Sequence, residues 1–339
     1  MSGIAIVSPG FPDRAGGVTD HTARLTRHWG RERRVVTYGS AEGDPEALAE
    51  AWHRAGVTAV LLQYVPFLYG RRGLSRFPRR VALAARRHGI RVTTFVHEPW
   101  VPPTRLPWIV LSPLQRRQLR RLLAASDGAA TPVPVWVPLL WNRPEVVPVG
   151  STLGEPGSPP EGPPLTSPVL FSPFASGLQW TWVVAAVQAI GADPPLIVIG
   201  ADADTARRHR TAGRWHDARW EYRGFAPPQD ALALLARARL VLAPFEDGLT
   251  GRRTSVLAAL STGARVVSSR GHLFDPAFDA SPVRLAGTEA EFAQTASHTW
   301  GEPDTEPQRG ARLRWYREHL DPAALDARLL RLVLGDGPP

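Results

Sequence analysis

The feature that most constrains the fold is a regular alternation of short apolar runs with amphipathic stretches. In the first half of the chain, the apolar runs lie at residues 4–7, 35–38, 59–64 and 92–96. Each run has the length of a buried strand, and the stretches between them carry apolar residues at helical spacing. Strands that alternate with helices in this way predict a parallel sheet covered by helices on both faces.

A second block of the same kind follows a break in composition. Residues 154–164 are so rich in proline and glycine that they cannot hold a helix or a central strand. Further strands are then predicted at residues 169–172, 196–199, 240–244 and 265–268. The sequence thus predicts an α/β fold of two doubly wound Rossmann-like domains, residues 1–150 and 151–317, facing each other across a cleft. A closing helix at about residues 318–339 is expected to pack back on the first domain.

The positive charge of the chain comes from an unusual choice of residues. All 40 basic side chains are arginine, and the formal net charge is +9. One interpretation is a surface attracted to phosphate, and the other is a coding bias that replaces lysine throughout. We expect no nucleic-acid partner, because neither a helix-turn-helix pattern nor an aromatic-and-basic module is present. The chain has no cysteine and no apolar run long enough for a membrane span, so we expect a cytoplasmic protein. Peripheral contact with the inner face of a membrane stays open.

The strongest functional signal follows the predicted strand that ends at Pro244. A loop with two glycines, Gly248 and Gly251, leads into an apolar helix that begins near Thr254. Such a helix start offers unpaired N–H groups and a positive dipole end, which suit a diphosphate. Other side chains of this stretch add hydroxyl donors, positive charge and hydroxyl-binding carboxylates, namely Ser255, Arg252, Arg253, Glu246 and Asp247.

These motifs occur in an order that resembles family-4 retaining glycosyltransferases, which have the GT-B fold. Residues 243–248, the helix after them and residues 263–267 are similar to the donor-binding region of that family. Residues 196–200 and 222–227 fall in the family's order upstream. Residues 16–21 resemble its glycine-rich acceptor loop, and His97-Glu98 stands where such enzymes place a histidine near the transferred sugar.

The resemblance implies three sets of site residues. The catalytic set is His97, Glu246 and Asp20. The donor-binding set is Gly17, Phe174, Gly177, Gly200, Gly224, Phe225, Asp247, Gly248, Leu249, Thr250, Arg252, Arg253, Thr254 and Ser255. The acceptor-binding set is Gly16, Val18, His21, Glu98 and Trp100.

The implied reaction moves a hexose from a nucleotide-diphosphate sugar to a carbohydrate, lipid-linked or small-molecule acceptor. It proceeds with retention, without a metal and without a cofactor other than the donor itself. Backbone N–H groups and arginines would stabilise the leaving diphosphate.

Two departures keep an alternative open. The family carries two glutamates eight positions apart, whereas here the count from Glu246 reaches Thr254, and alignment by Gly263 gives Thr250 and Ala258. A basic pair is also missing from residues 172–180, and our hypothesis is that Arg252 and Arg253 replace it. The alternative is a degenerate protein that binds a nucleotide sugar without transferring it.

Three weaker signals have structural interpretations of equal or greater weight. His97 either contacts the donor sugar or is a hydrogen-bonded structural histidine. Asp202 and Asp204 have a metal-binding spacing that is also typical of a helix-capping loop. Trp100 and Trp108 either line an acceptor cleft or pack in the core.

Overall fold

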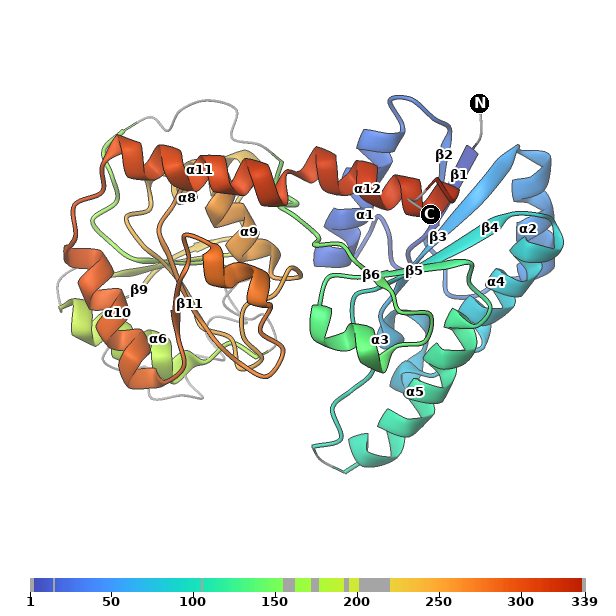
Figure 1. The fold of residues 1–339 in the computed structure, drawn as a ribbon, viewed down its shortest axis with the longest axis horizontal. Coiled ribbons are helices and arrows are strands. Elements are labelled where there is room, and N and C mark those ends of the chain that lie inside the picture. Colours follow the sequence, from blue (N-terminus) through green and yellow to red (C-terminus); the bar gives the residue numbers. More distant parts are fainter. Residues whose placement is uncertain are drawn as a thin grey trace. The chain divides into compact units, whose positions relative to one another are not determined.

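The chain forms two compact units, each built around its own sheet (Figure 1). The first unit comprises residues 1–149 and 322–339, and the second comprises residues 150–321. The computed structural model describes residues 3–14, 16–104, 106–154, 162–171, 177–191, 195–200 and 220–336.

The first unit contains a six-stranded sheet in the order β2-β1-β3-β4-β5-β6, with every neighbouring pair parallel. Its strands are β1 (Gly3–Val7), β2 (Val35–Tyr38), β3 (Val57–Tyr64), β4 (Arg91–Val96), β5 (Gly128–Thr131) and β6 (Glu145–Val146). Strand β1 is buried along its whole length, as expected for a central strand of a sheet covered on both faces.

Most helices of the first unit connect these strands. The unit's helices are α1 (Gly17–Trp29), α2 (Pro45–Arg54), α3 (Pro66–Tyr69), α4 (Phe77–Arg87), α5 (Trp108–Leu123) and α12 (Pro322–Leu334), with short 3-10 turns at Arg71–Gly73 and Pro134–Leu139. Helix α2 begins after Asp44, whose side chain caps it by accepting a hydrogen bond from the Glu46 N–H at 3.0 Å.

Helix α12 is part of the first unit's core although it comes from the end of the chain. Arg24 of α1 is buried, and its Nε and Nη2 donate to the Asp326 carboxylate of α12 at 3.0 and 2.6 Å. The Trp29 indole donates to the Asp326 carbonyl at 3.1 Å. Leu329 and Val333 pack into the same apolar cluster as Ile4. The ion pair is two-pronged and buried, so it fixes α1 relative to α12.

The second unit repeats the architecture with the order β12-β11-β10-β7-β8-β9, again parallel throughout. Its strands are β7 (Val169–Phe171), β8 (Leu196–Ile199), β9 (Trp220–Gly224), β10 (Val241–Ala243), β11 (Val266–Ser269) and β12 (Arg284–Ala286). Its helices are α6 (Trp180–Ile190), α8 (Pro228–Arg237), α9 (Thr254–Ser261), α10 (Glu289–Gly301) and α11 (Glu306–Leu320), with a 3-10 turn at Pro276–Ala280. The predicted fold class of two doubly wound parallel sheets is confirmed.

Strand order locates the ligand-binding edge of each sheet. The order reverses between β1 and β3 in the first unit and between β7 and β10 in the second. In open parallel sheets, ligands bind beyond the carboxyl ends of the strands at such a reversal. The loops after these four strands are therefore the places where the fold favours a site. No helix in the described residues combines the length and the apolar character that crossing a membrane requires.

Candidate functional site

In the second unit, the loops that follow β7 and β10 meet at the carboxyl edge of the sheet. The Glu246 N–H donates to the Gly177 carbonyl at 2.7 Å, and Leu178 pairs with Phe245 in an isolated antiparallel bridge. Gly177 has a φ of +79°, and a Cβ built there would lie 3.9 Å from the Arg253 guanidinium and from the Glu246 side chain. Three predicted site residues from separate stretches of sequence thus lie together.

Asp247 organises the charges in this loop. Its two carboxylate oxygens accept hydrogen bonds from Arg252 and Arg253, one from each. Arg253 is only 8% exposed, and its guanidinium lies over the Phe245 ring at 4.0 Å from the centroid. Asp247 offsets one of these two positive charges, and Glu246 beside them is exposed to water, so the fixed arginine pair is left to bind an anionic ligand.

Helix α9 begins directly after these arginines, as the sequence predicts. Arg253 is the N-cap residue, and its carbonyl accepts from the N–H groups of Val256 and Leu257 at 2.9 and 3.1 Å. No side chain among the described residues caps this helix start. Thr254 is half-buried and Ser255 is buried. The positive end of the α9 dipole therefore adds to the charge of the two arginines.

Two residues that the sequence analysis missed hold the loop in place. The Ser269 hydroxyl accepts from the Phe245 N–H and donates to the Phe245 carbonyl, both at 2.6 Å. A Cβ at Gly271 would lie 2.5 Å from the backbone nitrogen of Gly248, so only glycine fits there. The signal available in the sequence was the position of both residues at the end of the predicted strand at 265–268.

The other residues predicted to bind the donor do not all lie close to the arginine pair. Leu249 and Thr250 are fully buried, and the Thr250 hydroxyl has no hydrogen-bond partner in the described part of the chain. The Gly200 N–H donates to the Gly224 carbonyl at 2.8 Å, and the next residue, Phe225, is 69% exposed. Phe174 and the Asp202–Asp204 segment lie outside the described residues.

In the first unit, the structure brings His21 of α1 and His97 together. His97 follows β4, and its Nε2 lies 2.6 Å from Oε1 of Gln63 in β3. The ring centroids of His21 and His97 are 5.4 Å apart, and Phe95 packs against both rings. Gln63 was not identified from the sequence, because a polar residue inside an apolar strand gives no motif.

His21 is uncharged at neutral pH. Burial lowers its pKa well below 6.5, and the electrostatic influence of Arg24 and then of His97 lowers it further. The His21 ring is 1% exposed, and its Nδ1 finds no hydrogen-bond partner within the described residues. The first unit thus presents a buried imidazole pair, where the second presents arginines.

The remaining predicted residues of the first unit lie around this pair. Gly16, with a φ of +150°, is the N-cap of α1, and Gly17 and Val18 form its first turn. Asp20 lies on the exposed side of α1, and partial desolvation raises its pKa. Glu98 and Trp100 follow His97 and are half-buried, and the Arg116 guanidinium lies 4.6 Å above the Trp100 ring.

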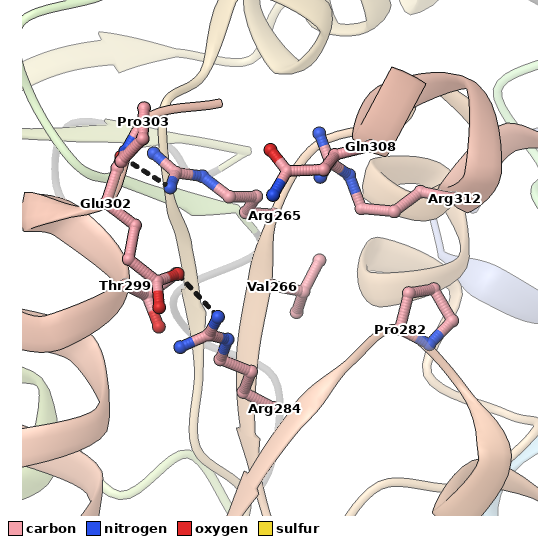
Figure 2. Close-up of a pocket in the computed structure, with 9 residues that line it drawn as sticks. All are labelled: Arg265, Val266, Pro282, Arg284, Thr299, Glu302, Pro303, Gln308 and Arg312. Carbon is pink, nitrogen blue, oxygen red and sulfur yellow. Dashed lines mark hydrogen bonds and ion pairs between the residues drawn. The ribbon is translucent and has the colours of Figure 1, made fainter. Parts of the chain in front are cut away.

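A polar cavity of about 130 Å³ lies at the opposite, amino-terminal edge of the second sheet (Figure 2). Arg265 precedes β11 and donates to the Glu302 carbonyl at 3.0 Å, and Arg284 of β12 pairs with the Glu302 carboxylate at 2.5 Å. Burial lowers the Arg265 pKa, and nearby Asp304 raises it. These contacts join α10 and α11 to the sheet, away from the loops described above. No group of three metal-ligating side chains occurs among the residues that the structure describes.

Two doubly wound domains with these topologies define the GT-B architecture, and solved structures share it. The chain is similar to AviGT4, a glycosyltransferase involved in avilamycin A biosynthesis, at 18% identity over 99% of both chains, with a TM-score of 0.60. It is also similar to a glycosyltransferase from Rickettsia africae at 10% identity over 99% of both chains, with a TM-score of 0.66.

The N-terminal domain of a trehalose-6-phosphate phosphatase from Candida albicans matches as well, at 10% identity with a TM-score of 0.65, over 98% of this chain and 96% of that one. No family model matches the sequence, and the search of curated proteins gives no match. At these identities the similarity establishes the GT-B fold, which confirms the fold that the resemblance implied, and leaves the chemistry to be argued from the site.

Proposed function

We propose that this protein is a glycosyltransferase that moves a sugar, of the hexose class, from a nucleotide-diphosphate sugar to a carbohydrate, lipid-linked or small-molecule acceptor. The observation that carries the proposal is the arginine pair held by Asp247 beside the Gly177 loop, at the strand reversal of the second sheet. The resemblance to family-4 enzymes and the shared fold support the same reaction class.

In this proposal, residues 151–317 bind the donor. Arg252, Arg253 and the start of α9 face the diphosphate, and Glu246, which is exposed beside them, binds hydroxyls of the donor. When the bond between sugar and diphosphate breaks, the leaving oxygens gain negative charge. Fixed arginines and a helix dipole stabilise that charge without reorganising and without a metal ion.

Residues 1–150 bind the acceptor in this proposal. Gly16 and Val18 give the acceptor close access to the backbone at the start of α1, and Asp20 orients its hydroxyl. His97, held by Gln63, donates a hydrogen bond to the transferred sugar. Retention follows if the acceptor attacks from the face that the diphosphate leaves, because a diphosphate oxygen then accepts the proton and no side-chain nucleophile is needed. We further propose a cytoplasmic location.

One observation favours a second candidate function. Thr250 occupies one of the positions where the resembling family has a glutamate, and its buried hydroxyl has no partner in the described part of the chain. A threonine there cannot supply the missing carboxylate. The second candidate is a protein that binds a nucleotide sugar without transferring it.

Calorimetric titration with uridine, guanosine, adenosine and thymidine diphosphate sugars tests the donor site. We expect one base to bind, and Arg252→Gln/Arg253→Gln to weaken that binding at least tenfold, which is about 1.4 kcal/mol. Arg116→Gln/Arg117→Gln removes the same charge elsewhere and should leave binding unchanged. Arg252→Lys/Arg253→Lys keeps the charge and serves as the folding control. Equal losses in the two glutamine variants would refute the donor site.

Turnover separates the two candidate functions. The donor that binds is incubated with a panel of acceptors, and transfer and slow hydrolysis are followed by mass spectrometry. The transferase proposal expects a glycosylated product or free sugar that disappears in His97→Ala. Tight binding with no product from any acceptor would favour the binding protein.

A further inference from the structure

Helix α5 (Trp108–Leu123) presents one exposed face whose two halves differ in chemistry. Its first two turns expose Ile109, Val110 and Leu114, and its last two turns expose arginines at 116, 117, 120 and 121. Val110 and Arg117 are seven residues apart, as are Leu114 and Arg121, so the apolar and basic side chains lie along the same side of the helix. The helix is therefore apolar at one end and basic at the other.

The apolar side chains at the start of α5 are highly exposed, and they are grouped rather than scattered singly over the surface. Val110 is 60% exposed and Leu106, just before the helix, is 77% exposed. Ile109 and Leu114 extend the same patch. The exposure of grouped aliphatic side chains to water is unfavourable in free energy. Such a patch therefore marks an interaction surface.

The basic end continues into a groove of about 910 Å³ between α4 and α5. Five arginines line it, namely Arg76, Arg79, Arg80, Arg117 and Arg121. Across the described ranges of the chain, no carboxylate lies within 4 Å of any of these five guanidinium groups. By contrast, Arg86 and Arg87, farther along α4, pair with Asp127 and Glu46.

The helix is held firmly on its other side. Gln118 accepts from the Ser75 N–H at 2.7 Å and donates to the Tyr64 hydroxyl at 3.1 Å, and Gln115 accepts from the Val101 N–H at 2.9 Å. On the basic end, the Arg120 guanidinium stacks over Trp141, which is itself exposed. The exposed face of α5 therefore has a fixed position, and Figure 1 shows the helix itself beside α4.

We propose that this face binds the surface of an anionic lipid bilayer, with the apolar end of α5 inserted between headgroups and the arginine groove against lipid phosphates. From Ile109 to Arg121 the helix rises about 18 Å, enough to reach from the acyl boundary to the phosphate layer when the helix is tilted. Arginine contacts phosphate through two N–H groups, and an exposed tryptophan suits the membrane interface.

The charge and polarity of this face favour a lipid bilayer over a second copy of the chain or a nucleic acid. A second copy of the chain seated symmetrically on this face would set its arginines either against those of the first copy or against the apolar end, and neither contact is favourable. A nucleic acid would satisfy the arginines but leave Val110, Leu106 and their neighbours against a charged backbone. Only an anionic bilayer supplies an apolar layer beside a layer of phosphates.

Co-sedimentation of the full chain with lipid vesicles tests the proposal and does not depend on the transferase activity. We expect binding to phosphatidylcholine vesicles that contain phosphatidylglycerol, weaker binding at higher salt, and none to phosphatidylcholine alone. Arg79→Gln/Arg80→Gln should lower the binding constant at least tenfold, since each arginine contributes about 1 kcal/mol near such a surface. Ile109→Ser/Val110→Ser should lower it comparably.

Arg86→Gln/Arg87→Gln is the matched control, because it removes the same charge from the same helix at positions already paired. It should bind vesicles like the unmodified protein. Circular dichroism confirms that each variant is folded. No binding to anionic vesicles at low salt, equal losses in the two arginine variants, or a dimer that Ile109→Ser/Val110→Ser dissociates would overturn the proposal.

Discussion

The ligand-binding edges of the two sheets have the same topology but opposite chemistry. In the first unit, this edge carries two buried imidazole rings, His21 after β1, which is uncharged, and His97 after β4, which is held by a neutral amide. In the second unit, the equivalent edge carries Arg252 and Arg253 around a single carboxylate. An edge of buried rings suits a hydroxyl-bearing acceptor, and an edge with fixed arginines suits a diphosphate. The difference teaches that strand order sets where a ligand binds, whereas the loop side chains set which ligand it is.

The largest expected effect comes from removing the carboxylate that organises the arginine pair. Asp247→Ala leaves two largely buried arginines facing each other without a counter-charge. We expect the free energy of unfolding to fall by about 3 kcal/mol, measured by urea denaturation. Asp279→Ala, which breaks the exposed ion pair with Arg270, is the control and should cost less than about 0.5 kcal/mol. Similar losses in both variants would show that the Asp247 cluster is ordinary surface charge.

A smaller effect is expected from crowding the same loop. In Gly271→Ala, the new methyl group meets the backbone of Gly248, so the loop must shift. We expect a loss of about 2 kcal/mol in unfolding free energy and weaker donor binding. Gly301→Ala is the control, because a Cβ there meets nothing within 4 Å and α10 ends at that residue. If Gly271→Ala bound the donor normally, the loop geometry would not matter for binding.

The smallest effect concerns the pH dependence of folding stability, which depends on the buried histidine His21. The pKa of His21 is lower in the folded protein than its ordinary value of about 6.5, so below that pH the unfolded chain binds more protons. Folding stability must then fall as the pH falls, and His21 alone accounts for about 1 kcal/mol between pH 6.5 and pH 5.5. His21→Phe, which keeps an aromatic ring beside Phe95, should remove that part of the loss. An identical pH dependence in both proteins would mean that folding does not shift the pKa of His21.

Much of the fold could be predicted from the sequence, because buried parallel strands are nearly continuous apolar runs. Strand β1 and the start of α9 at Thr254 lie where the pattern places them. Other elements give weak signals. Strand β5 consists of Gly128, two alanines and Thr131, of which only the threonine favours strands, and it is defined by its pairing with β4 and β6. Helix α5 runs through Pro113, a residue that usually marks a helix boundary.

The sequence predicts which loops form the candidate site, but it does not predict which residues contact one another within those loops. The glycines and arginines after β10 could be identified because they lie within one short stretch of sequence. The partners of those residues depend on how loops fold against one another, as with Ser269 and Phe245. The Arg24–Asp326 ion pair joins residues from opposite ends of the sequence, so no local pattern announces it.

The central claim is that a donor diphosphate rests against Arg253 and the first turn of α9. A crystal structure of the protein with the nucleotide-diphosphate sugar that binds in solution tests it most directly. The account predicts diphosphate oxygens within hydrogen-bond distance of the Arg252 or Arg253 guanidinium and of the Thr254 or Ser255 backbone. A diphosphate bound elsewhere, with the Asp247 cluster unchanged and untouched by ligand, would contradict it.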